Sequence, residues 1–297
     1  MTAPLAAYGR PTTRGWCIVL VLAGLAAVVG WGGLAVEPPP APAPPTAGPT
    51  APPPVGVVVR RYLWYLVLAV AAGAAAGILA AGAGGRLVMR LLAVTAGADA
   101  QGRITEAEEI VGRISVDGTI GFVVFTGLFL GLPSAVGYLL LRRWLPAGRA
   151  GGLAYGTLLL VAAGTRLEPL RRGNPDFDLV GPGWLAVAAF AALVIFHGML
   201  VAALAGRLSR AVPLLAAQPR AIAVHAPLLL LLLQGPSVAL VLVVVGALVV
   251  LVARIPAVVA AWHTRRLVTV GRVALAVAAL VAFPGFASAV LDILGRR

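Results

Sequence analysis

Long apolar stretches dominate the hydrophobic pattern of this chain. A helix that crosses a membrane needs about 20 apolar residues, because it rises about 1.5 Å per residue through a hydrocarbon core roughly 30 Å thick. Six stretches meet or nearly meet this length: Trp16–Val36, Tyr62–Ala83, Gly118–Leu141, Trp184–Gly206, Pro227–Ala253 and Val273–Leu291. The pattern therefore predicts an all-α protein, a polytopic transmembrane helical bundle.

A seventh apolar stretch, Gly151–Gly164, is shorter and lies between Arg149 and Arg166. It either spans the bilayer with both guanidinium groups reaching the headgroups, or enters the bilayer and returns. We predict about seven membrane segments, with six as the alternative. All six tryptophans lie at or near the ends of these stretches or in adjoining loops, as an aromatic belt requires.

A proline-rich stretch divides the chain. Residues 37–54 read EPPPAPAPPTAGPTAPPP, a composition that forms an extended spacer rather than a helix. The predicted domains are an N-terminal tail (1–15), an anchor helix (16–36), the proline-rich linker (37–56) and a six-segment bundle (57–297). The first apolar stretch exceeds the roughly 7–15 residues of a signal-peptide core, which favours a retained anchor over a cleaved signal.

The charge composition also indicates lipid as the solvent. Charged residues make up 11% of the chain, against about 25% in soluble domains. The net charge of +13 comes from arginine alone, and the arginines stand at the ends of apolar stretches, where they reach phosphate headgroups. We therefore expect membrane lipids as partners and no nucleic acid. The arginines divide almost evenly between the two sides of a seven-span arrangement, so orientation stays open, with an inside N-terminus slightly favoured.

Small residues recur at helix-packing intervals. Gly73 and Gly77, Gly127 and Gly131, and the stripe that starts at Gly198 are each spaced by four positions. Lipid supplies no hydrophobic drive between helices, so such faces associate by close backbone approach. We expect these glycines to pack the bundle internally, with a homo-oligomer or a membrane protein partner as the alternative.

His197 is the most unusual residue within a predicted span, because no charged residue lies near it in the apolar sequence VIFHGM. An ionisable group at this depth is expensive and is a candidate functional residue. It is a candidate proton relay, since its pKa normally lies near neutrality. The alternative, which we favour, is a buried neutral imidazole bonded to a neighbouring helix.

The stretch Pro227–Ala253 is interrupted by Gln234, Gly235 and Pro236. Proline removes a backbone donor, and broken helices of this kind line substrate sites in some transporters. Proline kinks are also ordinary in membrane helices. The sequence predicts a helix break here without deciding its role.

Two polar loops carry most of the acidic residues. In the first, Thr105 and Glu108 have capping-box spacing, which predicts a short surface helix over Glu106–Arg113. In the second, Asp176 and Asp178 are weak candidates for a shared divalent cation, although their Asn-Pro-Asp context favours a turn.

Arg86 and Arg90 lie one helical turn apart just beyond the second apolar stretch. They share a helix face and are candidates for binding a lipid phosphate, with ordinary interface anchoring as the alternative. The single cysteine, Cys17, excludes an intramolecular disulfide and a cysteine-rich metal site. No nucleophile elbow, Walker loop, HExxH or dinucleotide-binding pattern occurs, so we predict no catalytic residues, no metal and no cofactor.

Three segments, Gly84–Ala98, Arg142–Pro146 and Gly173–Trp184, resemble a group of uncharacterised multi-pass membrane proteins of GC-rich Gram-positive bacteria. The resemblance covers roughly residues 84–210. It implies a bacterial plasma membrane location and brings no activity or binding residues.

Three function classes fit this pattern. The first is a non-enzymatic membrane protein of the cell envelope, and the second a small-solute or proton-coupled transporter using His197 and the break at Pro236. The third is a membrane-embedded enzyme acting on lipid headgroups through Arg86, Arg90 and the acidic loops. We favour the first. Polar groups converging with His197 on a cavity would favour the second, and acids and arginines converging in an interfacial cleft the third.

Overall fold

The computed structural model describes residues 11–40, 53–106, 108–166, 170–232, 235–262 and 264–296, without the side chains of 11–14 and 232. Within these ranges the protein is all-helical, and its only β feature is an isolated bridge between Ile104 and Ile110. The α-helices are α1 (Pro11–Trp31), α2 (Val55–Ala76), α3 (Ala83–Thr95), α4 (Val116–Leu141), α5 (Arg149–Ala163), α6 (Gly183–Ser209), α7 (Pro219–Val224), α8 (Leu229–Leu232), α9 (Pro236–Ala253), α10 (Pro256–Trp262) and α11 (Arg265–Arg296). Four shorter turns are η1 (Gly77–Gly82), η2 (Ala98–Ala100), η3 (Pro175–Asp178) and η4 (Ala226–Leu228).

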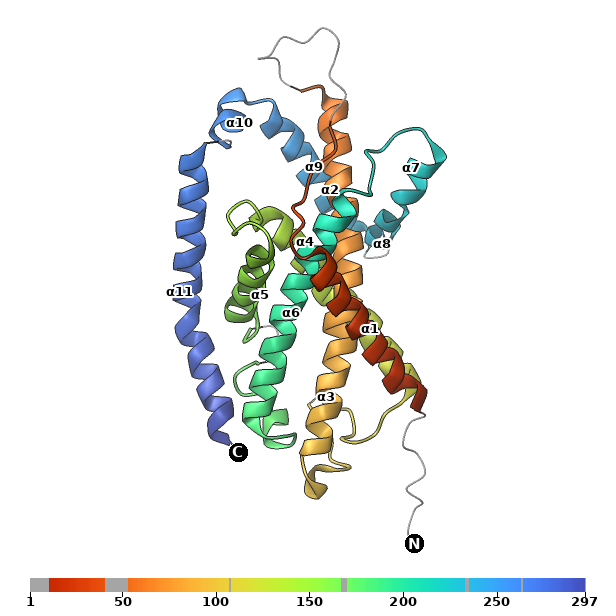
Figure 1. Cartoon of the computed structure of the whole chain (residues 1–297), viewed down its shortest axis with the longest axis vertical. Coiled ribbons are helices and arrows are strands. Elements are labelled where there is room, and N and C mark those ends of the chain that lie inside the picture. The colour runs from red at the N-terminus through yellow and green to blue at the C-terminus, as the bar shows by residue number, and fades with distance from the viewer. Residues whose placement is uncertain are drawn as a thin grey trace.

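The long helices run roughly along the long axis of the molecule (Figure 1). We call the top of that view the upper end: α2, α5 and α11 begin there, and α4 and α6 finish there. The lower end holds the start of α4 and α6 and the C-terminal end of α11. The polar loops 96–115 and 170–182 connect helices at the lower end.

A single long helix forms the centre of the bundle. α2, the π-helical turn η1 and α3 continue without a break over Val55–Thr95, 41 residues. α4 and α6 pack against it, and α5 packs against α6. Their side chains form one core cluster that includes the fully buried Trp64, Leu68 and Leu200. The indole of Trp64 donates a hydrogen bond of 2.9 Å to the Val212 carbonyl, so its one polar atom is satisfied inside this core.

Five helices among the described residues are long and apolar enough to cross a membrane: Val55–Thr95, Val116–Leu141, Gly183–Ser209, Pro236–Ala253 and Arg265–Arg296. The apolar parts of α1 and α5, Gly15–Trp31 and Arg149–Ala163, are shorter. The predicted all-α class and membrane-spanning character are thus supported, whereas the count of seven segments is not confirmed and stays a prediction.

The first helix belongs to the same bundle in space. α1 packs against α6, α3 and η1, and Cys17 is buried in a small cluster with Ala83 and Val123. At its other end, Trp31 lies under the Arg207 guanidinium, 5.7 Å from it. The predicted linker therefore separates α1 from α2 along the chain while α1 stays in contact with the rest; residues 1–10 and 41–52 lie outside the described part.

The C-terminal helices pack more loosely. In the most apolar stretch of α9 no residue is buried, and in the corresponding stretch of α11 only 6% of the residues are buried. The central parts of both helices are nevertheless apolar, with large side chains such as Val243, Val281 and Leu291 exposed. Surfaces of this kind are stable against hydrocarbon or another apolar surface and not in water.

The predicted surface helix over Glu106–Arg113 is wrong. The segment turns back on itself, with Thr105 N–H donating to the Glu109 carbonyl at 2.9 Å and Ile104 paired with Ile110. Glu108 has φ +59, the left-handed region, which no α-helix tolerates. The Thr105 hydroxyl accepts a hydrogen bond from Glu109 N–H at 3.2 Å and so stabilises a tight turn instead of a helix start.

Candidate functional site

His197 lies in the packed centre of the bundle, on α6. Its side chain is buried, and its Nε2 is 2.7 Å from the Ser134 hydroxyl on α4. Nδ1 makes no hydrogen bond of standard geometry to a described residue, although the Ala76 carbonyl at the end of α2 interacts with the ring. Three helices thus meet at this imidazole.

The Ser134 hydroxyl and His197 can each be the donor in the hydrogen bond between them. The hydroxyl has one proton and two acceptors in reach, Nε2 and the Gly131 carbonyl at 2.9 Å. If it donates to the Gly131 carbonyl, it accepts from Nε2–H and both bonds are made; if it donates to Nε2, the ring proton is on Nδ1, which has no partner of standard geometry among the described residues. The first arrangement makes more hydrogen bonds, so we assign the ring proton to Nε2.

Tyr155 of α5 completes the cluster. Its hydroxyl donates a hydrogen bond to the Ser134 carbonyl, and its ring packs edge-on against Tyr138 of α4. Pro133 precedes Ser134 within α4 and disturbs the regular backbone hydrogen bonding of that helix. The polar residues of the core therefore use their hydrogen-bonding groups to tie α4, α5 and α6 together.

The predicted packing glycines all lie at contacts between helices of this chain. Gly73 faces Gly131, where a Cβ would come within 2.7 Å of the Gly131 carbonyl oxygen, and Gly77 faces Gly127. Gly198 of α6 meets Gly156 of α5 in the same manner. Each contact leaves no room for a side chain, which is how helix backbones approach closely in lipid.

Arg86 and Arg90 point to α4. Arg86 Nε and Arg90 Nη2 each lie 3.4 Å from the hydroxyl of the buried Thr119, and Arg86 also lies over the Phe122 ring at 5.7 Å. The Thr119 hydroxyl donates to the Ser115 carbonyl and has lone pairs left to accept both arginines. The structure thus places this pair at a helix contact, and a lipid phosphate there stays a hypothesis.

The two candidate metal ligands are held by different partners. Asp176 Oδ1 accepts a hydrogen bond from Glu106 N–H at 2.8 Å, whereas Asp178 pairs with Arg296 at 3.3 Å. Asn174 caps the η3 turn by accepting from Asp176 N–H at 2.8 Å. The described residues hold no group of three or more His, Cys, Asp or Glu side chains suited to a metal, and a turn accounts for these contacts.

The predicted break falls where α9 begins. Gly235 has φ +98 and Pro236 is the first residue of α9, a position where the missing N–H of proline is harmless. Gln234 lies outside the described residues. The break lies apart from the His197 cluster, since α9 packs on the upper part of α2 through a Tyr62 hydroxyl bond to the Leu242 carbonyl at 2.7 Å.

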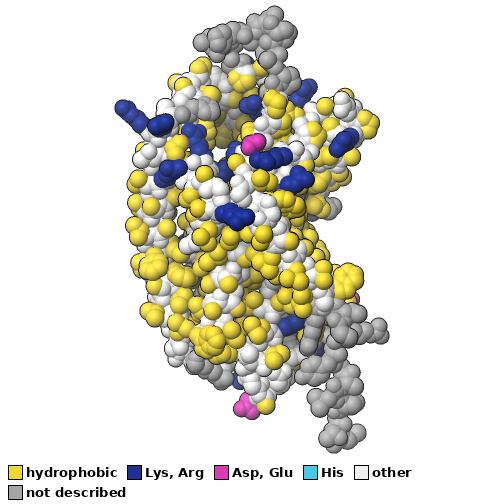
Figure 2. Space-filling model, in the orientation of Figure 1, with side chains coloured by type: hydrophobic (Ala, Val, Ile, Leu, Met, Phe, Trp, Pro, Cys, Tyr) yellow, Lys and Arg dark blue, Asp and Glu magenta, His cyan; other side chains and the backbone are white. Residues whose placement is uncertain are grey.

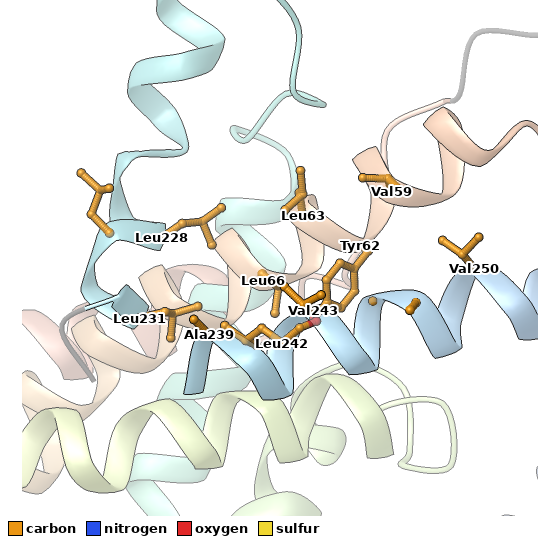
Figure 3. Close-up of a pocket in the computed structure, with 13 residues that line it drawn as sticks. Val59, Tyr62, Leu63, Leu66, Leu228, Leu231, Ala239, Leu242, Val243 and Val250 are labelled. Carbon is orange, nitrogen blue, oxygen red and sulfur yellow. The ribbon is translucent and has the colours of Figure 1, made fainter. Parts of the chain in front are cut away.

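Two hollows among the described residues have linings that do not include His197. The larger, of about 640 Å³, lies between α2, α8 and α9 and is apolar (Figure 3). The smaller, of about 350 Å³, is lined by Arg60, Ile222 and residues 215–217. Neither contains any of the predicted site residues.

Sequence reasoning missed Ser134, Tyr155 and Gly156. The small-residue spacing of Gly152 and Gly156 in α5 was a readable signal, equal to that of the stripes on α2 and α4. No sequence pattern marks Ser134 or Tyr155 as partners of His197, because they lie on other helices and meet it only through packing.

Comparison with known proteins adds no assignment: the sequence matches no protein-family model, and neither a curated protein nor a solved structure matches it.

Proposed function

We propose that the chain is a non-enzymatic, multi-pass protein of a bacterial plasma membrane that works by packing against itself or a partner in the envelope. The resemblance noted over residues 84–210 supports the bacterial location. The exposed apolar side chains along the central parts of α9 and α11 support embedding in lipid and leave room for a partner.

One observation carries the proposal. His197 is hydrogen-bonded through Nε2 to Ser134. The helices around it contact one another at glycines, which leaves little space beside the imidazole. A carrier needs a path by which solute or proton reaches such a group, and His197 lines neither of the two hollows described above. The imidazole acts here as a bond between helices.

A proton-coupled transporter is the second candidate, and a specific arrangement favours it. Ser134, Tyr155 and His197 meet from three helices, beside Pro133 and beside the Ala76–Gly77 junction where the helix becomes π-helical. Irregular helix turns recur at functional sites. A headgroup enzyme has less support, because Glu106 and Asp178 are engaged in ion pairs with Arg171 and Arg296.

Proton flux distinguishes the first two candidates. Purified protein in liposomes that enclose a pH-sensitive dye is given a pH gradient, beside protein-free liposomes and the variant His197→Gln. The proposal predicts the same slow leak in all three. Flux through the wild type that disappears in His197→Gln would establish the transporter in its place.

A further inference from the structure

Charge is distributed unequally between the two ends of the molecule. At the lower end the arginines stand among carboxylates, as in the pairs Arg171–Glu106 and Arg296–Asp292. At the upper end arginines gather at the ends of α2, α4, α6 and α9, and Glu37 is the only carboxylate among the described residues there. Figure 2 shows the same contrast, with basic side chains crowded over the top of the molecule. The upper end therefore has a large excess of positive charge.

Several upper-end guanidinium groups are held by aromatic rings and backbone carbonyls. Arg142 donates to the Val36 carbonyl at 3.0 Å and to the Tyr65 hydroxyl at 3.0 Å, and Arg143 lies 5.0 Å from the centre of the Trp262 ring. These contacts fix the cations without neutralising them. The face therefore complements an anion.

An apolar groove opens below this basic face. Its α2 wall is formed by Val59, Tyr62, Leu63 and Leu66, which recur at one-face helical spacing, and the facing wall includes Leu242 and Val243 of α9 (Figure 3). The only polar side-chain atom of its lining, the Tyr62 hydroxyl, is already bonded to the Leu242 carbonyl. The volume of about 640 Å³ is within the range of ligand sites. Such a groove suits a hydrocarbon chain.

Arg60 lies beside the groove, at its basic end. It follows Val59 on α2, about 100° further round the helix, and its side chain lines the second, smaller hollow of about 350 Å³ and not the groove itself. It is exposed, and no described polar group contacts it. Arg61, also exposed, lies about 100° further round the helix and away from the groove face. Two neighbouring arginines of equal charge thus differ in their position relative to the groove.

We propose that this site binds one anionic phospholipid, with an acyl chain in the groove between α2 and α9 and the phosphate on Arg60. The groove supplies apolar contact and the carboxylate-poor upper end supplies the preference for negative charge. The inference rests on the membrane location proposed above.

The test is a titration of the purified full-length protein with phosphatidylglycerol, followed as lipid adducts by native mass spectrometry. Phosphatidylcholine with the same chains measures the preference for charge, and soluble glycerol phosphate measures binding of the headgroup alone. The variants are Arg60→Gln, the matched control Arg61→Gln, and Ala247→Phe, which places a ring in the groove.

We expect phosphatidylglycerol to bind more tightly than phosphatidylcholine, Arg60→Gln to weaken it about fivefold and Arg61→Gln to leave it unchanged. Ala247→Phe should weaken both lipids, and glycerol phosphate should not compete. Equal losses in the two arginine variants, equal binding of the two lipids, or competition by glycerol phosphate would each overturn the site. Carbonate washing of the source membranes separates the two claims, because release of the wild type there contradicts the membrane location itself.

Discussion

At the scale of single residues, the core shows how a polar group is accommodated in an apolar bundle. His197 would be costly in hydrocarbon without a partner. The Ser134 hydroxyl, on a different helix, supplies that partner at 2.7 Å. The chemistry of the residue predicted a bonded imidazole, but its partner depends on the packing of α4 against α6, which no local pattern encodes.

Removing this hydrogen bond should have a small effect on stability. His197→Gln can replace one bond and should keep the fold, while His197→Leu should cost about 1 kcal/mol or less, because bonds between membrane helices average roughly 0.6 kcal/mol. Thermal unfolding in detergent measures both variants.

A matched pair isolates the interhelical part. Ser134 and Ser288 each donate to a carbonyl three residues back, at 2.9 Å, but only Ser134 also meets a histidine. Ser134→Ala should therefore lower stability more than Ser288→Ala, and a double-mutant cycle with His197→Leu should show coupling. If the two serine variants lowered stability equally and the cycle showed no coupling, the hydrogen bond between Ser134 and His197 would not contribute to stability.

Substitutions at the glycine contacts should lower stability more than loss of the His197 hydrogen bond. A Cβ at Gly131 would collide with the Gly73 carbonyl oxygen and the Gly77 Cα, whereas one at Gly121 on the same helix meets nothing within 4 Å. Gly131→Ile should destabilise the bundle by about 1–3 kcal/mol. Gly121→Ile should change the unfolding temperature little. Equal thermal stability of the two variants in detergent would exclude a close contact at Gly131.

At the scale of elements, apolar length predicted the long helices well, because lipid demands a helix wherever about 20 apolar residues follow one another. Short polar segments were harder. The capping-box spacing at Thr105 predicted a helix, but Ile104 pairs with Ile110 and Glu108 takes a left-handed turn. The same Ser/Thr side chain stabilises a helix start or a tight turn, so spacing alone does not decide between them.

The sequence likewise did not predict which helices α1 packs against. Its 17 apolar residues from Gly15 to Trp31 predict a membrane helix and say nothing of its neighbours. In the structure it is fastened by long-range contacts, such as the bond of 2.8 Å from Arg149 to the Val29 carbonyl. α1 is therefore a component of the bundle as well as an N-terminal segment.

Cutting the chain between α1 and α2 tests this role. With a protease site inserted within residues 41–52 and a tag at the C-terminus, the cleaved α1 fragment should co-purify in detergent with the tagged remainder. Gly24→Leu should release it, because a Cβ there already comes within 2.9 Å of Phe196 and 3.2 Å of Leu200. Gly30→Leu, in open space on the same helix, is the control and should not. If the cleaved α1 fragment of the wild type failed to co-purify with the tagged remainder, the packing of α1 against the bundle would be contradicted.

At the scale of the whole molecule, the proposed function requires the two polar ends to lie on opposite sides of a membrane. The helical spans between them are apolar, and the charged groups gather at the ends. Composition was sufficient to predict the membrane, since a chain with 11% charged residues lacks the polar surface of a soluble protein. It did not predict how charge divides between the ends, because that depends on which loops meet in space.

Labelling of single cysteines tests this arrangement most directly. Cys17 is the only cysteine, so Cys17→Ser gives a blank background for Ala147→Cys in the exposed upper turn and Arg172→Cys in the exposed lower loop. In sealed membrane vesicles of one orientation, an impermeant maleimide should label only one of the two positions, and both after permeabilisation. Labelling of both positions in the intact vesicles would place the two ends on the same side and contradict a membrane-spanning bundle.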